Sequence, residues 1–320
     1  MTNKEKYLLF CEQERSIPIF SQAWWLNTVA GDVWDVCLLE NGEGVLATMP
    51  YVMSSGSYGF VYLSHPRLTP VLGPWLKPAK GKYSKMLSQQ KDWLQALIEQ
   101  LPKYDYFNQN WHYSQTNWLP LYWKNFEQTT KYTYVLEDLS DNNKLWNDLD
   151  SSLRTQIRKA EKAGLVVRND LPIEDFIALN EMTFLRQGMK MPDSESFIKM
   201  FAEKAQERNQ CMWFIAKDDK DQNHAGVLIV WDEQSAYYLM GGGNPDLRTS
   251  GAASLCMWEA IKFASTVSEK FDFEGSMLES VERFFRGFGA VQKQYFSVTH
   301  KPSKTLNIIQ DVRKIFRHLF

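Results

Sequence analysis

The stretch GGGNPDLRTSGAASL, residues 241–255, decides how the surrounding chain folds. Three glycines and an Asn-Pro turn signal follow an apolar run with strand character, and small residues lead into an apolar run with helical spacing. The pattern predicts a strand that ends in a loop and passes into a helix. A helix N-terminus exposes unpaired N–H groups and the positive end of the macrodipole, and Arg248 adds a cation. We therefore expect a phosphate-binding loop here.

Composition sets the class of protein. The chain has 320 residues, of which 44 % are hydrophobic and 14 % aromatic, enough to build two domains. A formal net charge of −2 argues against general DNA binding. No segment has the apolar h-region of a signal peptide or the length of a membrane span, so we expect a cytoplasmic protein. The four cysteines are isolated in the sequence, and neither a metal site nor disulfides are predicted.

Two segments of the chain repeat each other. LYWKNFEQTTKYTYVL (121–136) aligns without a gap with RFFRGFGAVQKQYFSV (283–298), at an offset of 162 residues. Upstream of these, WLQALIEQLPKYDYF (93–107) parallels WEAIKFASTVSEKFDF (258–273) if the second copy carries one extra residue. Two matches in the same order indicate a tandem duplication.

The order of elements predicts the fold class. In the second half we expect helices over 143–163, 173–187, 193–208, 249–266 and 279–289, and strands over 166–169, 211–218, 224–232, 235–242, 271–275 and 292–300. The first half repeats this more loosely, with helices over 21–30 and 83–101, strands near 33–40, 44–53, 58–63 and 104–108, and a proline-rich loop over 64–82. This order predicts a mixed α/β (α+β) fold of two domains, 1–140 and 141–320, each a mostly antiparallel sheet flanked by helices.

Three motifs carry a resemblance to a known family. The segment from Arg248 to Ala253 resembles the R/Q-x-x-G-x-G/A loop of the GNAT acyltransferases, which holds the pyrophosphate of coenzyme A. SSLRTQIRKAEKAGLVV (151–167) and FDFEGSMLESVERFFRGFGA (271–290) resemble segments of the FemAB-like proteins and the related acetyltransferase-6 family. The resemblance covers the second half well and reaches the first half mainly through the duplication. It implies two GNAT-like domains and transfer of an acyl or aminoacyl group to an amine.

The resemblance also implies the co-substrates. GNAT proteins use acyl-CoA, whereas FemAB-like proteins move an amino acid from aminoacyl-tRNA onto a peptidoglycan precursor, so the donor is either of these. The chain lacks the long helical hairpin that some FemAB proteins carry. The first half has the loop LTPVLGPWLKP (68–78) where the donor motif would lie. We therefore expect one donor site, in domain 141–320, with domain 1–140 as a degenerate copy on the acceptor side.

Candidate catalytic residues lie near the predicted loop. By the resemblance, SAYYLMGG (235–242) and FDFEG (271–275) line the donor cleft. Glu274 is the first candidate for the base that takes a proton from the amine, and Asp272 is expected on the same strand face by two-residue alternation. Tyr238 is a candidate hydrogen-bond donor. The alternatives are that Asp272 caps a neighbouring loop and that Tyr238 belongs to the core.

Candidate binding residues fall in two groups. The donor loop comprises Arg248, Thr249, Ser250, Gly251, Ala252 and Ala253. The alternative interpretation of this segment is a surface turn in which Gly251 supplies a positive φ before a helix. The second group, Arg154 and Arg158, shares one face of the basic helix with Lys162 and either recognises substrate phosphate or forms a solvated face.

We therefore expect an N-acyltransferase acting on an amine of a nucleotide- or lipid-linked cell-wall precursor, with tRNA as a further candidate partner. One alternative is CoA-dependent acylation of a sugar amine or small metabolite; another is a silent GNAT-like binding protein. The segment TLNIIQDVRKIFRHLF (305–320) has an apolar face with basic residues beside it. That face is suited either to packing on its own domain or to docking at the inner membrane surface.

Overall fold

The computed structural model describes residues 1–275 and 277–306. Contacts divide the chain into two compact units, one of residues 1–131 with the segment from 294 onward, and one of residues 132–293. The chain passes between the units twice, within strand β6 (Glu127–Leu136) and within strand β12 (Val291–His300). The predicted segment 305–320 lies almost entirely outside the described residues.

Unit 1 is a sheet with helices on both faces. Its strands follow the order β1-β2-β3-β5-β12, with β4 beside β2. The elements are α1 (Asn3–Gln13), α2 (Ala23–Ala30), β1 (Trp34–Asn41), β2 (Gly44–Ser55), β3 (Val61–Ser64), β4 (Trp75–Leu76), α3 (Tyr83–Glu99), β5 (Tyr106–Asn110) and α4 (Leu119–Tyr122), with short 3₁₀ turns η1 (Ile19–Ser21) and η2 (Ser57–Gly59).

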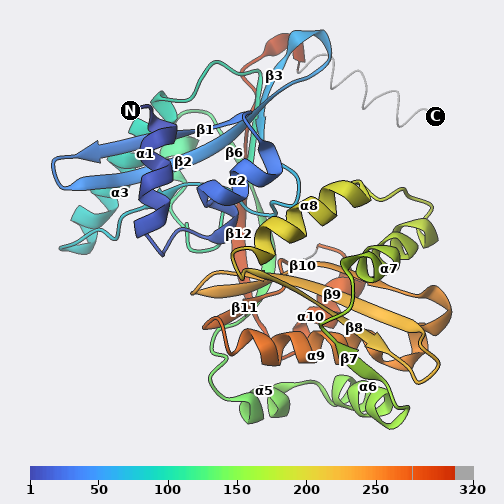
Figure 1. The fold of residues 1–320 in the computed structure, drawn as a ribbon. Helices are drawn as coiled ribbons and strands as arrows, with labels where there is room; N and C mark the ends of the chain where they lie inside the picture. Colours follow the sequence, from blue (N-terminus) through green and yellow to red (C-terminus); the bar gives the residue numbers. More distant parts are fainter. Residues whose placement is uncertain (276, 307–320) are drawn as a thin grey trace. The chain divides into compact units, whose positions relative to one another are not determined.

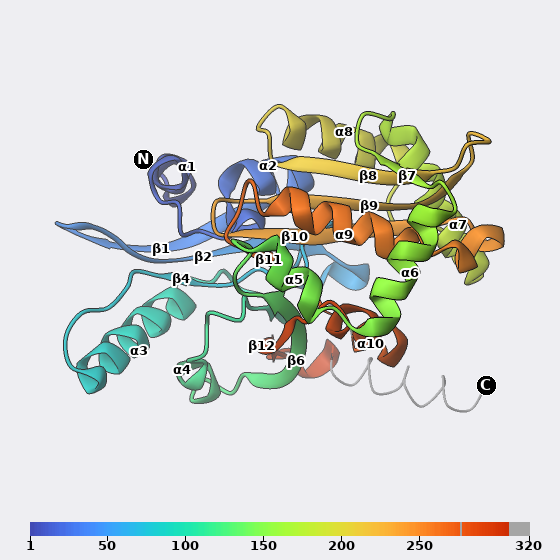
Figure 2. The same ribbon diagram turned by 90° about the horizontal axis from the view of Figure 1, so that it is seen from below.

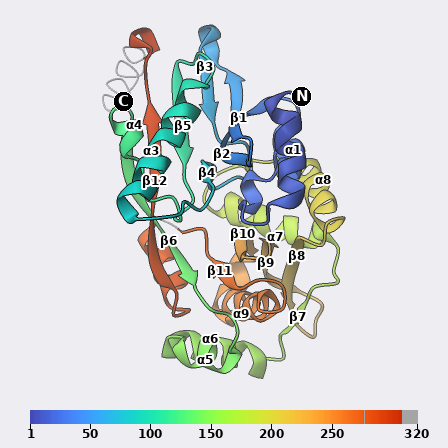
Figure 3. The same ribbon diagram turned by 90° about the vertical axis from the view of Figure 1, so that its left-hand side faces the viewer.

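Because side chains alternate along a strand, the sheet contributes apolar side chains to a core on each of its two faces. Val36 and Leu38 of β1 pack in the cluster formed by α1 and α2, whereas Cys37 between them packs in the cluster that holds Leu94 and Leu97 of α3. Figure 3 shows α1 and α3 on opposite faces of β1 and β2. The helix α1 was not predicted, although Thr2 and Glu5 form a capping box that marks its start.

Unit 2 is built in the same way around the strand order β6-β11-β10-β9-β8-β7. Its further elements are α5 (Asn142–Asp148), α6 (Ser151–Lys162), β7 (Val166–Arg168), α7 (Ile173–Arg186), α8 (Glu195–Gln206), β8 (Cys211–Lys217), β9 (Asn223–Trp231), β10 (Ser235–Gly243), η3 (Pro245–Ser250), α9 (Ala252–Ala264), β11 (Lys270–Asp272) and α10 (Glu279–Arg286). Figure 1 shows α9 under one face of β8–β10 and α7 with α8 over the other. Strand β9 is therefore apolar on both sides.

The two units confirm the tandem duplication. In each, the third strand of an antiparallel meander runs parallel to the strand that follows a long helix: β3 pairs with β5, and β10 pairs with β11. The last strands are exchanged. In unit 2, Val135 and Leu136 of β6 pair with β11, and in unit 1, residues 297–300 of β12 pair with β5. Each sheet is thus completed by a strand from the other repeat.

Two predicted helices have different bounds in the structure. The helix expected over 143–163 is broken into α5 and α6, because the N–H of Asp150 donates to the carbonyl of Gly287 (2.8 Å) and not along a helix. The helix expected over 249–266 begins only at Ala252, because η3 occupies the preceding residues.

The glycine triplet lets α7 approach β10 closely. A Cβ on Gly242 would lie 2.3 Å from the backbone nitrogen of Asn180, and a Cβ on Gly241 would lie 2.0 Å from the hydroxyl of Tyr238. The Asn180 side-chain amide donates to the carbonyl of Gly241 (2.7 Å), which fastens the helix to the strand. Packing against the backbone of α7 thus accounts for Gly242, whereas the atom nearest a Cβ on Gly241 is the end of the Tyr238 side chain.

We predict that Gly242→Ala destabilises the protein by about 1–3 kcal/mol, because the added methyl meets backbone that cannot move aside. Gly243→Ala is the matched control, since its Cβ would meet its nearest neighbour at an ordinary 3.5 Å. Chemical unfolding of the two variants measures the difference. Equal losses of stability would contradict this account of the triplet.

Candidate functional site

A pair of acidic side chains lies where β11 ends. Asp272 is 3 % exposed and lies in register with Val135 of β6 and Tyr237 of β10. One oxygen of its carboxyl, Oδ1, accepts hydrogen bonds from the Thr133 hydroxyl and from the N–H of Glu274 (2.9 Å). A strand of the first repeat therefore supplies one of the partners of Asp272.

Glu274 lies in a left-handed turn beyond the strand. Its φ is +57°, which is rare for a residue with a side chain, and Gly275 follows with φ +62°. Only glycine fits at 275, because a Cβ there would lie 2.1 Å from the carbonyl oxygen of Tyr132. The prediction that 271–275 is a strand with Asp272 and Glu274 on one face is therefore wrong. The turn, and not strand alternation, brings the two residues together.

Burial controls the protonation of this pair. It raises the pKa of Asp272 to about 6, against the opposing effect of the hydrogen bonds from Thr133 and Glu274. Burial first, and the charge of Asp272 second, raise the pKa of Glu274 well above its ordinary value. Glu274 Oε1 is shielded from solvent and has no hydrogen-bond partner among the described residues. Two such carboxyls do not ionise together readily, so the pair can hold and release a proton near neutral pH.

Tyr238 lies on β10 at a β-bulge. The register with β9 shifts between Tyr238 and Met240, and the Tyr238 ring packs edge-on against Phe285 with 5.6 Å between centroids. Burial raises its pKa to about 12, so the hydroxyl keeps its proton. Beyond Tyr237, β10 continues to Gly243 without further pairing to β11, which has ended. Tyr238 is thus the first residue of β10 that is no longer paired with β11.

The predicted donor loop forms the start of α9. Arg248 is exposed and forms no hydrogen bond or ion pair with any residue that the structure describes. No side chain caps α9, and its N-cap residue is Gly251. The N–H groups of Ala253 and Ser254 therefore lack an intrahelical acceptor, while that of Ala252 is 3.3 Å from the Ser250 hydroxyl.

Gly251 also has a packing role. Its φ is +83°, and a Cβ there would lie 2.3 Å from the carbonyl oxygen of Gln156 in α6. The same helix contributes Lys159, whose ammonium donates to the Thr249 carbonyl (2.6 Å), and Gln156, which accepts from Ser254 (3.0 Å). Figure 2 shows α6 beside the η3 end of α9. The basic helix thus holds the loop in place.

The two arginines expected to bind substrate contact α5. Arg154 donates to the carbonyl of Asn147 (2.7 Å), at the C-terminal end of that helix. The Arg158 guanidinium lies over the Trp146 ring, 5.5 Å from its centroid. Both contacts have a structural purpose, so substrate binding by these arginines remains a prediction.

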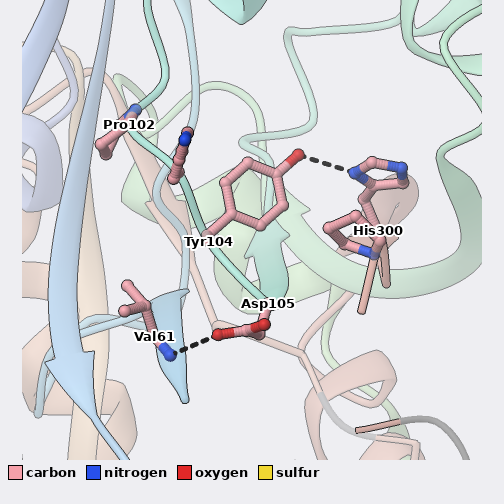
Figure 4. A pocket seen from close by; sticks show the side chains of 7 residues that line it. Val61, Pro102, Tyr104, Asp105 and His300 are labelled. Carbon is pink, nitrogen blue, oxygen red and sulfur yellow. Dashed lines mark hydrogen bonds between the residues drawn. The ribbon is translucent and has the colours of Figure 1, made fainter. Parts of the chain in front are cut away.

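A separate pocket of about 480 Å³ opens in unit 1 (Figure 4). Tyr104 and His300 meet there, with 2.7 Å between the hydroxyl and Nδ1, and Asp105 accepts the N–H of Val61 (2.9 Å). Burial raises the pKa of Tyr104 and lowers that of His300, so the pair is neutral. No sequence pattern indicates this pocket, because Tyr104 and His300 are 196 positions apart. No residue predicted for catalysis or donor binding lines it.

The loop of unit 1 that corresponds to the donor loop is closed by His65. The imidazole Nδ1 lies 2.8 Å from the Thr69 carbonyl, and Nε2 accepts the N–H of Asn110 at 2.5 Å. Burial lowers the pKa of His65 to about 4, so the ring is neutral with its proton on Nδ1. The loop satisfies its own polar groups, which fits the expectation that the first repeat has no donor site.

The described residues contain no group of three or more His, Cys, Asp or Glu side chains arranged to hold a metal ion. Nor does any described helix have the length and apolar character needed to cross a membrane.

Residues 148–278 match the model of a family described as an acetyltransferase (GNAT) domain. This part of the second half is therefore similar to a GNAT acetyltransferase domain, and the predicted acyltransferase class is confirmed. The predicted resemblance to the FemAB-like, acetyltransferase-6 branch is confirmed with it. No curated protein matches the sequence.

Solved structures with little sequence identity share the fold. FemX superposes with a TM-score of 0.68 and 13 % identity, covering 92 % of this chain and 96 % of that one. L-PGS from Bacillus licheniformis has a TM-score of 0.55 and 11 % identity, with coverage of 97 % and 96 %. A tandem GNAT protein from the clavulanic acid biosynthesis pathway has a TM-score of 0.53 and 9 % identity, with coverage of 94 % of each chain. The predicted fold of two GNAT-like domains is thereby confirmed.

We predict that His65 makes the protein less stable in acid. Its pKa is about 6.5 in an unfolded chain and about 4 in the folded one, so between these values the unfolded state binds more protons. The free energy of unfolding therefore falls as pH drops from 6.5 to 4, by up to about 3 kcal/mol from this residue. Unfolding of the wild type and His65→Gln across this range measures it. A variant with the same pH dependence as the wild type would contradict the prediction.

Proposed function

We propose that the protein is an N-acyltransferase that acts on an amine of a cell-envelope precursor. The observation that carries the proposal is the carboxyl pair of buried Asp272 and partly buried Glu274 within the residues that match a GNAT domain. Glu274 Oε1 is shielded from solvent and has no hydrogen-bond partner among the described residues. No lysine or arginine among the described residues forms an ion pair with either carboxyl. An incoming ammonium group would supply that missing partner.

The pair would act on the proton of the acceptor. An amine arrives protonated at neutral pH and becomes a nucleophile only when it loses a proton. A carboxylate shielded from water has a raised pKa, which makes it a better base for that step. Tyr238, which keeps its proton, is placed to donate a hydrogen bond from β10.

The donor would bind at the start of α9. The residues fit a pyrophosphate, because Arg248 has no partner among the described residues and the Ala253 and Ser254 N–H groups lack intrahelical acceptors. Thr249, Ser250, Gly251 and Ala252 complete this loop. A bound acyl-CoA or aminoacyl-tRNA would supply the activated carbonyl. The closed loop around His65 supports a single donor site, in the second repeat.

The FemAB-like resemblance favours an amine of a nucleotide- or lipid-linked peptidoglycan precursor as acceptor, with aminoacyl-tRNA as donor. Such an acceptor places the reaction in the cytoplasm, at or near the inner face of the membrane. Arg154 and Arg158 remain candidates for binding its phosphates. CoA-dependent acylation of a sugar amine or small metabolite is the second candidate, favoured by the uncapped α9 start and Arg248.

We predict that Arg248→Ala weakens binding of CoA or acetyl-CoA by roughly 1.5–3 kcal/mol, the value of a charge-assisted contact. Calorimetric titration of the purified protein measures this. Arg186→Ala, which removes another exposed arginine of unit 2, is the control and should bind as the wild type does. Absence of CoA binding in the wild type would reject CoA as donor, and labelling of a lipid- or UDP-linked peptide by aminoacyl-tRNA would then identify the other donor. Failure of both donors would reject the enzyme in favour of a binding protein.

We predict that Glu274→Gln lowers the transfer rate about 100-fold or more, because the amide cannot exchange a proton within the carboxyl pair or pass one to the leaving group. Donor binding should stay unchanged, since the donor loop is a separate group of residues. Glu279→Gln, an exposed carboxyl at the start of α10, is the control. Release of free CoA or tRNA in the presence of acceptor measures the rate. A Glu274→Gln variant with full activity would remove this residue from the mechanism.

A further inference from the structure

We propose that Thr133 is a positioning residue of the carboxyl pair, which keeps Asp272 ionised and so directs the single proton of the pair to Glu274. The inference rests on the function proposed above, because it gives the pair a defined state before the acceptor arrives. Thr133 lies outside the residues that match the GNAT family model, on the last strand of the first repeat.

The hydrogen bonds of the two carboxyls are unequal. Asp272 Oδ1 accepts both the Thr133 hydroxyl and the Glu274 N–H. Glu274 Oε1 accepts nothing from the described residues. Hydrogen bonds to a carboxylate favour its charged form, and burial without them favours the neutral form. The shared proton therefore belongs on Glu274.

Among the residues that the structure describes, no neighbouring unpaired charge competes with this arrangement. The titratable side chains next to Asp272 on β10 and β6 are Tyr237, Tyr238 and Tyr134, which are neutral at physiological pH. On α9, which packs against β11, Glu259 and Lys262 pair with each other (2.7 Å). On α10, Glu282 pairs with Arg286 (2.9 Å) and accepts the Tyr134 hydroxyl. Thr133 is thus the side chain that distinguishes the two carboxyls.

With Asp272 ionised and Glu274 protonated, the pair can both accept and supply a proton during acyl transfer. A pair with one proton and one negative charge attracts the ammonium of the acceptor and takes one proton from it, which leaves a neutral pair with two protons. The freed nitrogen attacks the acyl carbonyl and the C–N bond forms. The bond from the carbonyl carbon to the sulfur or oxygen of the donor breaks, and that atom receives a proton from the pair. This returns the pair to one proton and one negative charge, and the amide nitrogen releases its remaining extra proton to water.

The test is a carboxyl titration of the free protein. The ¹³C signals of Asp and Glu side chains are followed against pH and assigned with Asp272→Asn and Glu274→Gln. As the pH is raised, we expect Asp272 to lose its proton before Glu274 does. In Thr133→Val this titration should move up by about one to two pH units, the effect of a lost hydrogen bond to a charged group. Thr133→Ser keeps a hydroxyl and should stay near the wild type, as should Thr129→Val, which removes an exposed hydroxyl of the same strand.

Two results would overturn the proposal: Glu274 titrating before Asp272, or Thr133→Val leaving the Asp272 titration in place. Thr133→Ala serves as a second hydroxyl-free variant if the valine variant does not fold. The titration needs neither donor nor acceptor, so it fails independently of the proposed function. If the titration shifts as expected but no donor supports transfer, Thr133 positions the pair and the proposed function is wrong.

Discussion

The hydrogen bond from Thr133 to Asp272 joins the two repeats of this chain at the carboxyl pair of Asp272 and Glu274. It exists because β6, the last strand of the first repeat, pairs with β11 of the second. A buried carboxyl is costly without such a donor, since burial removes the water that would stabilise its charge. The exchanged strand thus supplies both backbone pairing for the sheet edge and the polar partner for its buried acid.

Left-handed backbone occurs both at the carboxyl pair and at the start of α9. Glu274, Gly275 and Gly251 all have positive φ, and both glycines lie against the backbone of a neighbouring element. A side chain at Glu274 in this conformation is unfavourable locally and is retained by its surroundings. Local rules of chain conformation are broken where the proposed chemistry takes place, which is where functional constraint and folding preference compete.

Much of the architecture was predictable from particular residues. The matches between 121–136 and 283–298 predicted the duplication, and both segments contain a short helix followed by a strand. The small residues after Arg248 predicted the loop and helix, because Gly251 can only be read as a left-handed start or a close contact. The break between α5 and α6 was not predictable, since the acceptor of the Asp150 N–H is Gly287, far along the chain. Thr133 escaped detection for the same reason.

The sequence by itself determined the class of fold and the duplication, and it singled out the loop proposed to bind the donor and the candidates Glu274 and Asp272, because these depend on periodicity and on motifs that are local in the chain. Only the tertiary structure decided which strand completes each sheet, why Gly242 is needed, and which hydroxyl contacts Asp272. Those outcomes depend on contacts between residues more than a hundred positions apart or on the approach of one backbone to another. No local pattern in the chain encodes such distances.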